Sequence, residues 1–133
     1  GTSKYNNHLQ EQCLGIGTWS SGTNCEIRAT DNITAYYSSD QRLKENVVNI
    51  SSHLDKLNQI NGVNFNWIPV EGIHSNEGHD IGVIAQEIEA ILPEVVTTRE
   101  NGYKAVRYEK IVALLIEAIK EQQLQINELK SRL

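Results

Sequence analysis

Residues 108–133 constrain the fold most strongly, because their apolar side chains recur at alternating intervals of four and three residues. This is the spacing of a coiled-coil seam, in which a helix buries an apolar stripe against other helices. Gln122 is a polar residue within the seam, and such a residue can set the register or the number of chains. We expect a helix here that assembles with copies of itself, preferably as a trimer and alternatively as a dimer. The seam consists of Tyr108, Val112, Leu115, Ile119, Gln122, Ile126, Leu129 and Leu133.

The first half of this helix carries further apolar residues beside the seam. Ile111, Leu114, Ile116 and Ala118 widen the apolar surface there. Only 39% of the chain is hydrophobic and 6% is aromatic, so a large self-contained core is not expected. We therefore expect the helix to pack first on its own domain and then on other chains.

The preceding segment predicts a second helix and a strand. Leu54, Leu57 and Ile60 have helical spacing, with a capping serine at 51–52 and Gly62 near the end. Residues 63–67 alternate between apolar and polar side chains and are expected to form a strand, which Pro69 ends.

A loop, a helix and a hairpin are expected next. Residues 70–80 are polar and predict a loop. A short apolar entry then leads into a helix that stops before Pro93. Its apolar side consists of Ile84, Ile88, Ile91 and Leu92. Residues 95–106 predict a hairpin with its turn at 99–102.

Residues 1–38 differ in composition from the rest, because they are rich in Gly, Ser, Thr and Asn. Residues 25–29 and 33–36 alternate and predict short strands, and no helix signal appears. So few strands do not make a stable sheet alone. We therefore expect an α+β chain whose N-terminal part is the end of a fibrous β structure that other chains complete.

Charge and hydropathy exclude several classes of protein. The net charge is −5 and no basic cluster is present, which argues against nucleic acid as a partner. No apolar run approaches the length of a membrane span, and the N-terminus is not a signal peptide; it resembles the interior of a longer protein. Cys13 and Cys25 are too few for a disulfide scaffold and are expected to be free thiols.

Ser39 and Lys44 could form a nucleophile and its base at the junction between the two halves. A lysine amine can deprotonate a serine hydroxyl when it is desolvated. A turn through residues 40–42, with Asp40 as its N-cap, would bring the two side chains together. The serine can then attack the carbonyl of Ser38, because the chain itself supplies proximity. The spacing by itself favours a helix cap beside a solvated lysine, because a serine followed by a lysine within a few residues is common.

No other pattern of residues points to a cofactor. His74, His79 and Asp80 are a weak metal candidate, since no second cluster supports them, and we expect no metal. A phosphate-binding glycine loop, a nucleophile elbow and a zinc-protease motif are all missing from the sequence. We therefore expect no cofactor.

Several motifs together resemble one family. Over residues 33–125 the chain is similar to the C-terminal intramolecular chaperone domains of phage tailspikes and tail fibres, of the endosialidase type, which also occur in the myelin regulatory factor of animals. The matching stretches are SD at 39–40, RLKENV at 42–47, GVIAQEI at 82–88, LPEVV at 92–96 and VRY at 106–108, followed by Leu114, Leu115, Ala118 and Ile119.

The resemblance implies a homotrimer that guides an upstream triple β-helix to fold and then releases itself. Ser39 would be the nucleophile and Lys44 the general base, with the cut between Ser38 and Ser39 or, as the fallback, between Ser39 and Asp40. Arg107 matches a family arginine that senses or orients the cleavage site. Asp40 and Gln86 would support the local geometry, and His79 and Asp80 are further candidates.

The same resemblance predicts the domains and the location. Residues 1–38 would end the stalk, and residues 39–133 would form the chaperone domain, with its coiled-coil helix at 108–133. Assembly would occur in the host cytoplasm, and the stalk would stay with the virion while the chaperone part is released.

Two alternatives belong to other classes. A structural trimer foot would keep the seam but would not need Ser39 or Lys44. The cleavage domain of a membrane-tethered transcription factor would use the same chemistry, and the glycosylation triplets beginning at Asn32 and Asn49 favour it mildly.

Overall fold

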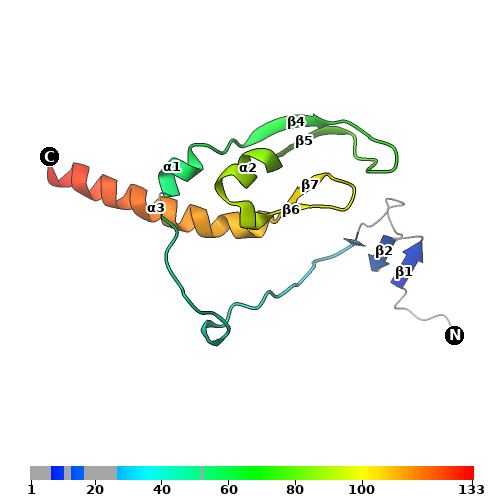
Figure 1. Cartoon of the computed structure of the whole chain (residues 1–133), viewed down its shortest axis with the longest axis horizontal. Helices are drawn as coiled ribbons and strands as arrows, with labels where there is room; N and C mark the ends of the chain where they lie inside the picture. Colours follow the sequence, from blue (N-terminus) through cyan, green and yellow to red (C-terminus); the bar gives the residue numbers. More distant parts are fainter. Residues whose placement is uncertain (1–6, 11–12, 17–26, 52) are drawn as a thin grey trace. The chain divides into compact units, whose positions relative to one another are not determined.

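The computed structural model describes residues 7–10, 13–16, 27–51 and 53–133, and it has the α+β fold that the sequence predicts (Figure 1). Small sheets and short helices are followed by a long C-terminal helix. The chain divides into two compact units. The first consists of Gly1–Glu45 and Ile68–Glu77, and the second of Asn46–Trp67 and Gly78–Leu133.

The first unit contains a three-stranded sheet with the order β1-β2-β3. β1 (Asn7–Gln10) pairs antiparallel with β2 (Cys13–Ile16), and β2 pairs parallel with β3 (Ile27–Ala29). β3 lies within the strand predicted for residues 25–29, of which Cys25 and Glu26 lie outside the described residues. The sequence analysis missed β1 and β2, whose four-residue stretches do not alternate clearly.

The strand predicted for residues 33–36 is wrong. Residues 32–40 have no regular secondary structure and are exposed throughout. Alternating apolar and polar residues suit a strand, but a strand also needs a neighbouring strand to pair with its backbone N–H and C=O groups. The first unit also contains the one-turn helix η1 (Gln41–Leu43).

The second unit is built around α3 (Tyr108–Ser131), which confirms the predicted C-terminal helix. The short turn η2 (Pro93–Val95) packs against it, and Ile88 of α2 (Ala85–Ile91) shares a buried cluster with Leu114 of α3. Leu92 stops α2 before Pro93 as predicted. The buried residues of the core come from these elements. They are Ile88, Leu92, Val95, Leu114 and Ala118.

α1 (His53–Leu57) is shorter than the helix predicted to end near Gly62. The amides of Gln59 and Ile60 donate to carbonyls three residues back, so the chain tightens and leaves the α-helix after Leu57. A five-residue helix is not stable alone. α1 instead lies on α3, where Oε2 of Glu121 accepts a hydrogen bond from the amide of Leu54 at 3.3 Å.

Two hairpins complete the second unit. β6 (Val96–Thr98) and β7 (Lys104–Val106) form the predicted one, and its turn closes by a 2.8 Å bond from Gly102 N to Arg99 O. Gly102 has φ +86°, a conformation that favours glycine.

The second hairpin pairs β4 (Val63–Trp67), a predicted strand, with β5 (Gly78–Gly82). The loop predicted for residues 70–80 is therefore wrong at its end, because residues 78–80 belong to β5. These residues do not alternate like a strand in the sequence, and they become one because they pair with Phe65–Trp67. Within the described part of the chain, no helix has the length and apolar character needed to cross a bilayer.

Candidate active site

Asp40 starts the turn that carries the predicted serine and lysine. Its Oδ1 accepts a 2.8 Å hydrogen bond from Arg42 N, which makes it the N-cap of η1, as predicted. The turn is closed by Leu43 N donating to Asp40 O at 3.0 Å and Lys44 N donating to Gln41 O at 3.1 Å. This local fold reverses the chain between residues 39 and 44.

The turn places the ammonium group of Lys44 against the hydroxyl of Ser39. Lys44 Nζ donates a hydrogen bond to Ser39 Oγ over 2.8 Å. This is within the reach required between a nucleophile and its general base. When the amine is neutral, the same short contact lets the hydroxyl donate to Nζ instead. The geometry can therefore support proton transfer from Ser39 to Lys44.

Arg42 occupies both oxygens of the Asp40 carboxylate. Arg42 Nε lies 3.0 Å from Oδ1 and Nη2 lies 2.9 Å from Oδ2, so the ion pair is bidentate. The side-chain hydrogen bonds from Arg42, and then the bond from its backbone amide, lower the pKa of Asp40 below its usual value. The same pair raises the pKa of Arg42. Arg42 is not predictable as a partner of Asp40, because side chains two residues apart do not face each other on a regular helical turn.

The site is open to solvent in the single chain. Ser39, Asp40 and Lys44 are exposed, and so are the large apolar side chains on either side of them. Tyr36 is 94% exposed and Val48 is 85% exposed. Lysine general bases usually work in desolvated surroundings. The chain thus brings the two reacting groups together without excluding water from them.

The other predicted supporting residues belong to the second unit. Gln86 is an exposed residue of α2. Arg107 is exposed and precedes α3; its amide donates to Val95 O at 2.8 Å, and its carbonyl accepts from Lys110 N at 3.1 Å. Ser39 and Lys44 lie in the first unit, next to Ser38 and Asp40.

His74 and Asp80 have structural partners. Both ring nitrogens of His74 are engaged: Nε2 lies 2.8 Å from Ile68 O, and Nδ1 accepts from Asn76 N at 3.1 Å. In β5, Asp80 accepts from its neighbour Ile81 N and from Trp67 Nε1 at 3.0 Å, and these bonds lower the pKa of Asp80. Among the described side chains, no three His, Cys, Asp or Glu residues come together in a metal-binding group.

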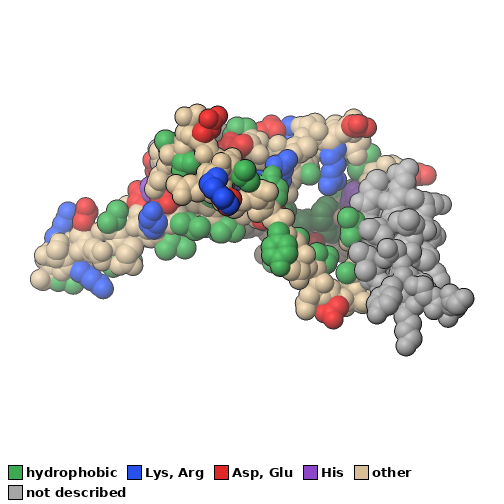
Figure 2. Space-filling model, turned by 90° about the horizontal axis from the view of Figure 1, so that it is seen from below, with side chains coloured by type: hydrophobic (Ala, Val, Ile, Leu, Met, Phe, Trp, Pro, Cys, Tyr) green, Lys and Arg blue, Asp and Glu red, His purple; other side chains and the backbone are tan. Residues whose placement is uncertain are grey.

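The predicted seam residues form a face of α3 that its own domain leaves uncovered. Leu114 is fully buried, whereas its neighbour Leu115 is 39% exposed and Ile119 is 64% exposed. Figure 2 shows hydrophobic side chains along the outer surface of this helix. α3 thus has one face in its own core and a second apolar face open to solvent. The exposed seam residues are Val112, Leu115, Ile119, Gln122, Ile126 and Leu129.

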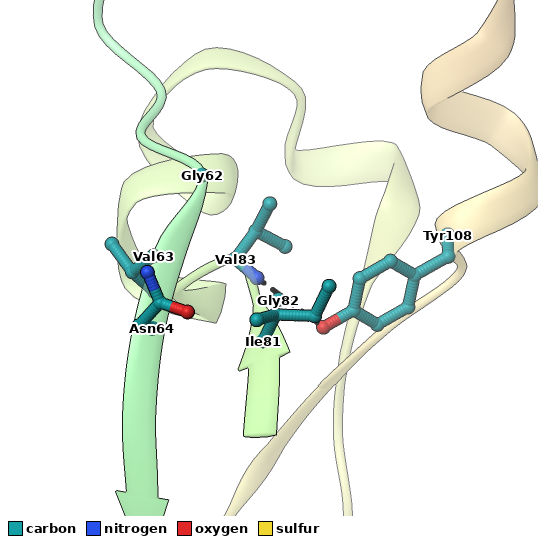
Figure 3. Close-up of a pocket in the computed structure, with 7 residues that line it drawn as sticks. All are labelled: Gly62, Val63, Asn64, Ile81, Gly82, Val83 and Tyr108. Atoms are coloured by element: carbon teal, nitrogen blue, oxygen red, sulfur yellow. Dashed lines mark hydrogen bonds between the residues drawn. The ribbon is translucent and has the colours of Figure 1, made fainter. Parts of the chain in front are cut away.

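A cavity of about 490 Å³ lies between the β4–β5 hairpin and the start of α3 (Figure 3). Residues 62–64 and 81–83 line it together with Tyr108. The Tyr108 hydroxyl accepts a 3.4 Å hydrogen bond from Val83 N. Gly82 leaves room for this approach, because a Cβ there would lie 2.8 Å from the hydroxyl oxygen and the Tyr108 side chain would have to shift. Tyr108, predicted as the first seam residue, thus also ties α3 to β5.

The chain matches a known class of protein at this site. Residues 39–97 match the family described as the chaperone of endosialidase, whose name also marks it as a peptidase family. The stretch that begins at Ser39 therefore belongs to this family, as the motifs suggested.

The particular relatives are phage tail fibre proteins. The chain is 34% identical over 117 residues to the long tail fiber protein Gp37 of Enterobacteria phage K3. The aligned residues cover 83% of this chain and 9% of the relative. It is 34% identical over 103 residues to the Gp37 protein of Salmonella phage S16, covering 72% of this chain and 14% of the relative. The chain thus spans a small fraction of the length of these relatives.

Proposed function

We propose that this chain is an intramolecular chaperone of a phage tail fibre, which trimerises its parent protein and then cuts itself off at Ser39. The 2.8 Å contact between Lys44 Nζ and Ser39 Oγ carries the catalytic part of this proposal. The family match and the tail fibre relatives support the chaperone part. Residues 1–38 would be the end of the fibre stalk, and residues 39–133 the chaperone domain.

The uncovered face of α3 supports self-association. Seam residues at alternating intervals of four and three present a stripe that copies of the same helix can bury by knobs-into-holes packing. Gln122 within this stripe can set the number of chains, and three is the number that a triple β-helix needs. Joining three chains at one end raises the effective concentration of the stalk strands, whose polar sequence specifies register weakly.

The cleavage reaction uses groups of one chain. Neutral Lys44 accepts the hydroxyl proton of Ser39, and Oγ attacks the carbonyl carbon of Ser38. The peptide bond between Ser38 and Ser39 breaks as Lys44 returns the proton to the leaving amine of Ser39, which leaves an ester between the two residues. Water then hydrolyses the ester, giving a carboxylate on Ser38 and restoring the hydroxyl. A cut between Ser39 and Asp40 would instead require attack on the carbonyl carbon of Ser39 itself, with the amine of Asp40 leaving and taking up the proton from Lys44.

Assembly would complete the site by excluding water. Lys44 and the apolar residues on either side of it are exposed in the single chain, so neighbouring chains would supply the desolvation that a lysine base needs. Arg107 and Gln86 would then orient the site, either from the same chain or from a partner. Cleavage would follow correct assembly and occur once per chain, and the stalk would remain with the virion.

The proposal is tested by intact mass and a denaturing gel on the wild type, Ser39→Ala and Lys44→Ala. We expect the wild type to split near residue 38 and both variants to stay whole. Ser38→Ala is the matched control, because the reaction needs its carbonyl and not its hydroxyl. Cleavage by Lys44→Ala at the wild-type rate would contradict the assigned base, and the masses of the pieces identify the bond.

The exposure of the site favours one second candidate, a trimer foot that does not cleave. In that case Ser39 and Lys44 would form a solvated cap of the turn. The foot predicts a whole chain that sediments as a trimer. A longer upstream stalk separates it from a chaperone that lacks its trigger, since only the chaperone would then cleave.

A further inference from the structure

The turn at the cleavage site holds a carboxylate that could compete for the catalytic lysine. Asp40 precedes Lys44 by four residues, a spacing at which acidic and basic side chains pair on a helical turn. In the structure this pair does not form. Lys44 donates to Ser39, and the carboxylate of Asp40 binds the backbone amide and the guanidinium of Arg42.

The choice of partner matters because a general base has to lose its proton first. A carboxylate next to a lysine favours the charged ammonium, whereas a nearby positive charge disfavours it. A lysine paired with Asp40 would therefore be a poor acceptor for the Ser39 proton, and it would be turned away from the hydroxyl. Arg42 opposes both effects, since it neutralises Asp40 and adds a positive charge to the same turn.

We propose that Arg42 is a positioning residue for self-cleavage: by holding Asp40 in a bidentate pair, it leaves Lys44 free to bind Ser39. This inference rests on the proposed function. The charged groups next to Lys44 along the turn are Asp40, Arg42 and Glu45. Among the described side chains, Arg42 is the one that the structure pairs with the carboxylate of Asp40.

A role in capping the turn would have a different signature. Asn caps helices about as well as Asp, because its side-chain oxygen accepts the same backbone hydrogen bond. If Asp40 and Arg42 only shape the turn, their loss slows cleavage equally at every pH. If Arg42 controls Asp40, its loss moves the pH dependence, and removing the carboxylate restores it.

The test follows self-cleavage of the full chain by intact mass from pH 5 to pH 10 during cell-free synthesis. The chains are the wild type, Arg42→Ala, Asp40→Asn and the double variant. We expect Arg42→Ala to move the profile to higher pH by about half a unit or more, roughly a threefold loss below the midpoint. The double variant should return to the profile of Asp40→Asn. A parallel loss at every pH, or a double variant that keeps the shift, would overturn the inference.

A second measurement separates this inference from the proposed function. In a Ser39→Ala background, the Lys44 side chain is titrated by NMR with and without Arg42→Ala. The titration midpoint should rise when Arg42 is removed, and an unchanged midpoint would refute the inference even if the chain cleaves. If the chain with a longer upstream stalk does not cleave, or if Lys44→Ala still does, the proposed function fails, while the titration still decides how Arg42 acts.

Discussion

Leu114 and Leu115 are neighbours on α3 in different environments, and truncating each of them separates the two packing roles of the helix. Leu114 is fully buried in the core with Ile88, Leu92 and Val95. Leu114→Ala should therefore lower the free energy of unfolding by about 3 kcal/mol, from the range of about 2.7–5 kcal/mol for buried leucines. The loss should not depend on protein concentration, because the contacts lie within one chain.

Leu115→Ala should act on association instead. Leu115 is 39% exposed in the single chain, and only that part is left for a partner to cover. Removing its outer carbons should cost about 1 kcal/mol per chain, at about 0.8 kcal/mol per buried CH₂. Three copies per trimer give about 3 kcal/mol, or roughly a 150-fold lower association constant.

The assay combines denaturant unfolding with sedimentation velocity over a range of concentrations, in a Ser39→Ala background so that cleavage does not intervene. Gln125→Ala is the control, because Gln125 is an exposed residue of α3 outside the seam. If Leu115→Ala leaves self-association unchanged, or if Leu114→Ala affects association alone, the division of α3 into a core face and a partner face is wrong.

Three further predictions concern other parts of the chain. Gly82→Ala should destabilise the second unit by about 1 kcal/mol, because the new methyl group would push the Tyr108 hydroxyl away from Val83 N. Thermal unfolding should show a smaller loss when Tyr108→Phe is already present, and an equal loss would contradict the assigned clash. The hydrogen bonds from Arg42 lower the pKa of Asp40 below its usual value of 3.8. The ionised carboxylate therefore stabilises η1 above pH 3.8, and this stabilisation is lost as the pH falls through the lower pKa of the folded state. NMR of the Arg42 amide should report the loss, and Asp40→Asn should abolish the pH dependence. Gln122→Leu should strengthen self-association and can change the number of chains, which sedimentation equilibrium measures; unchanged association would exclude Gln122 from the seam.

The sequence predicted most of the second unit, because its signals are local. The spacing of apolar residues identified α3, the proline at 93 ended α2, and the turn at 99–102 identified the β6–β7 hairpin. The N-cap at Asp40 was also predictable, because a capping side chain bonds to an amide only two residues away.

The sequence did not predict features that depend on a distant partner. Residues 78–80 form a strand because they pair with β4. Residues 33–36 do not form one, because they pair with no strand among the described residues. The helix predicted from residue 51 is shortened to α1, which lies on α3, where Glu121 accepts a hydrogen bond from the amide of Leu54.

The candidate site divides in the same way. The sequence by itself identified Ser39 and Lys44 as a possible pair and the seam of α3 as an apolar stripe, because residue type and spacing are properties of the chain. Only the tertiary structure decided that Lys44 donates to Ser39 while Arg42 forms an ion pair with Asp40. It also decided that Leu114 is buried while Leu115 is open to solvent. These outcomes depend on which groups compete for the same partner in space, and spacing along the chain does not record that competition.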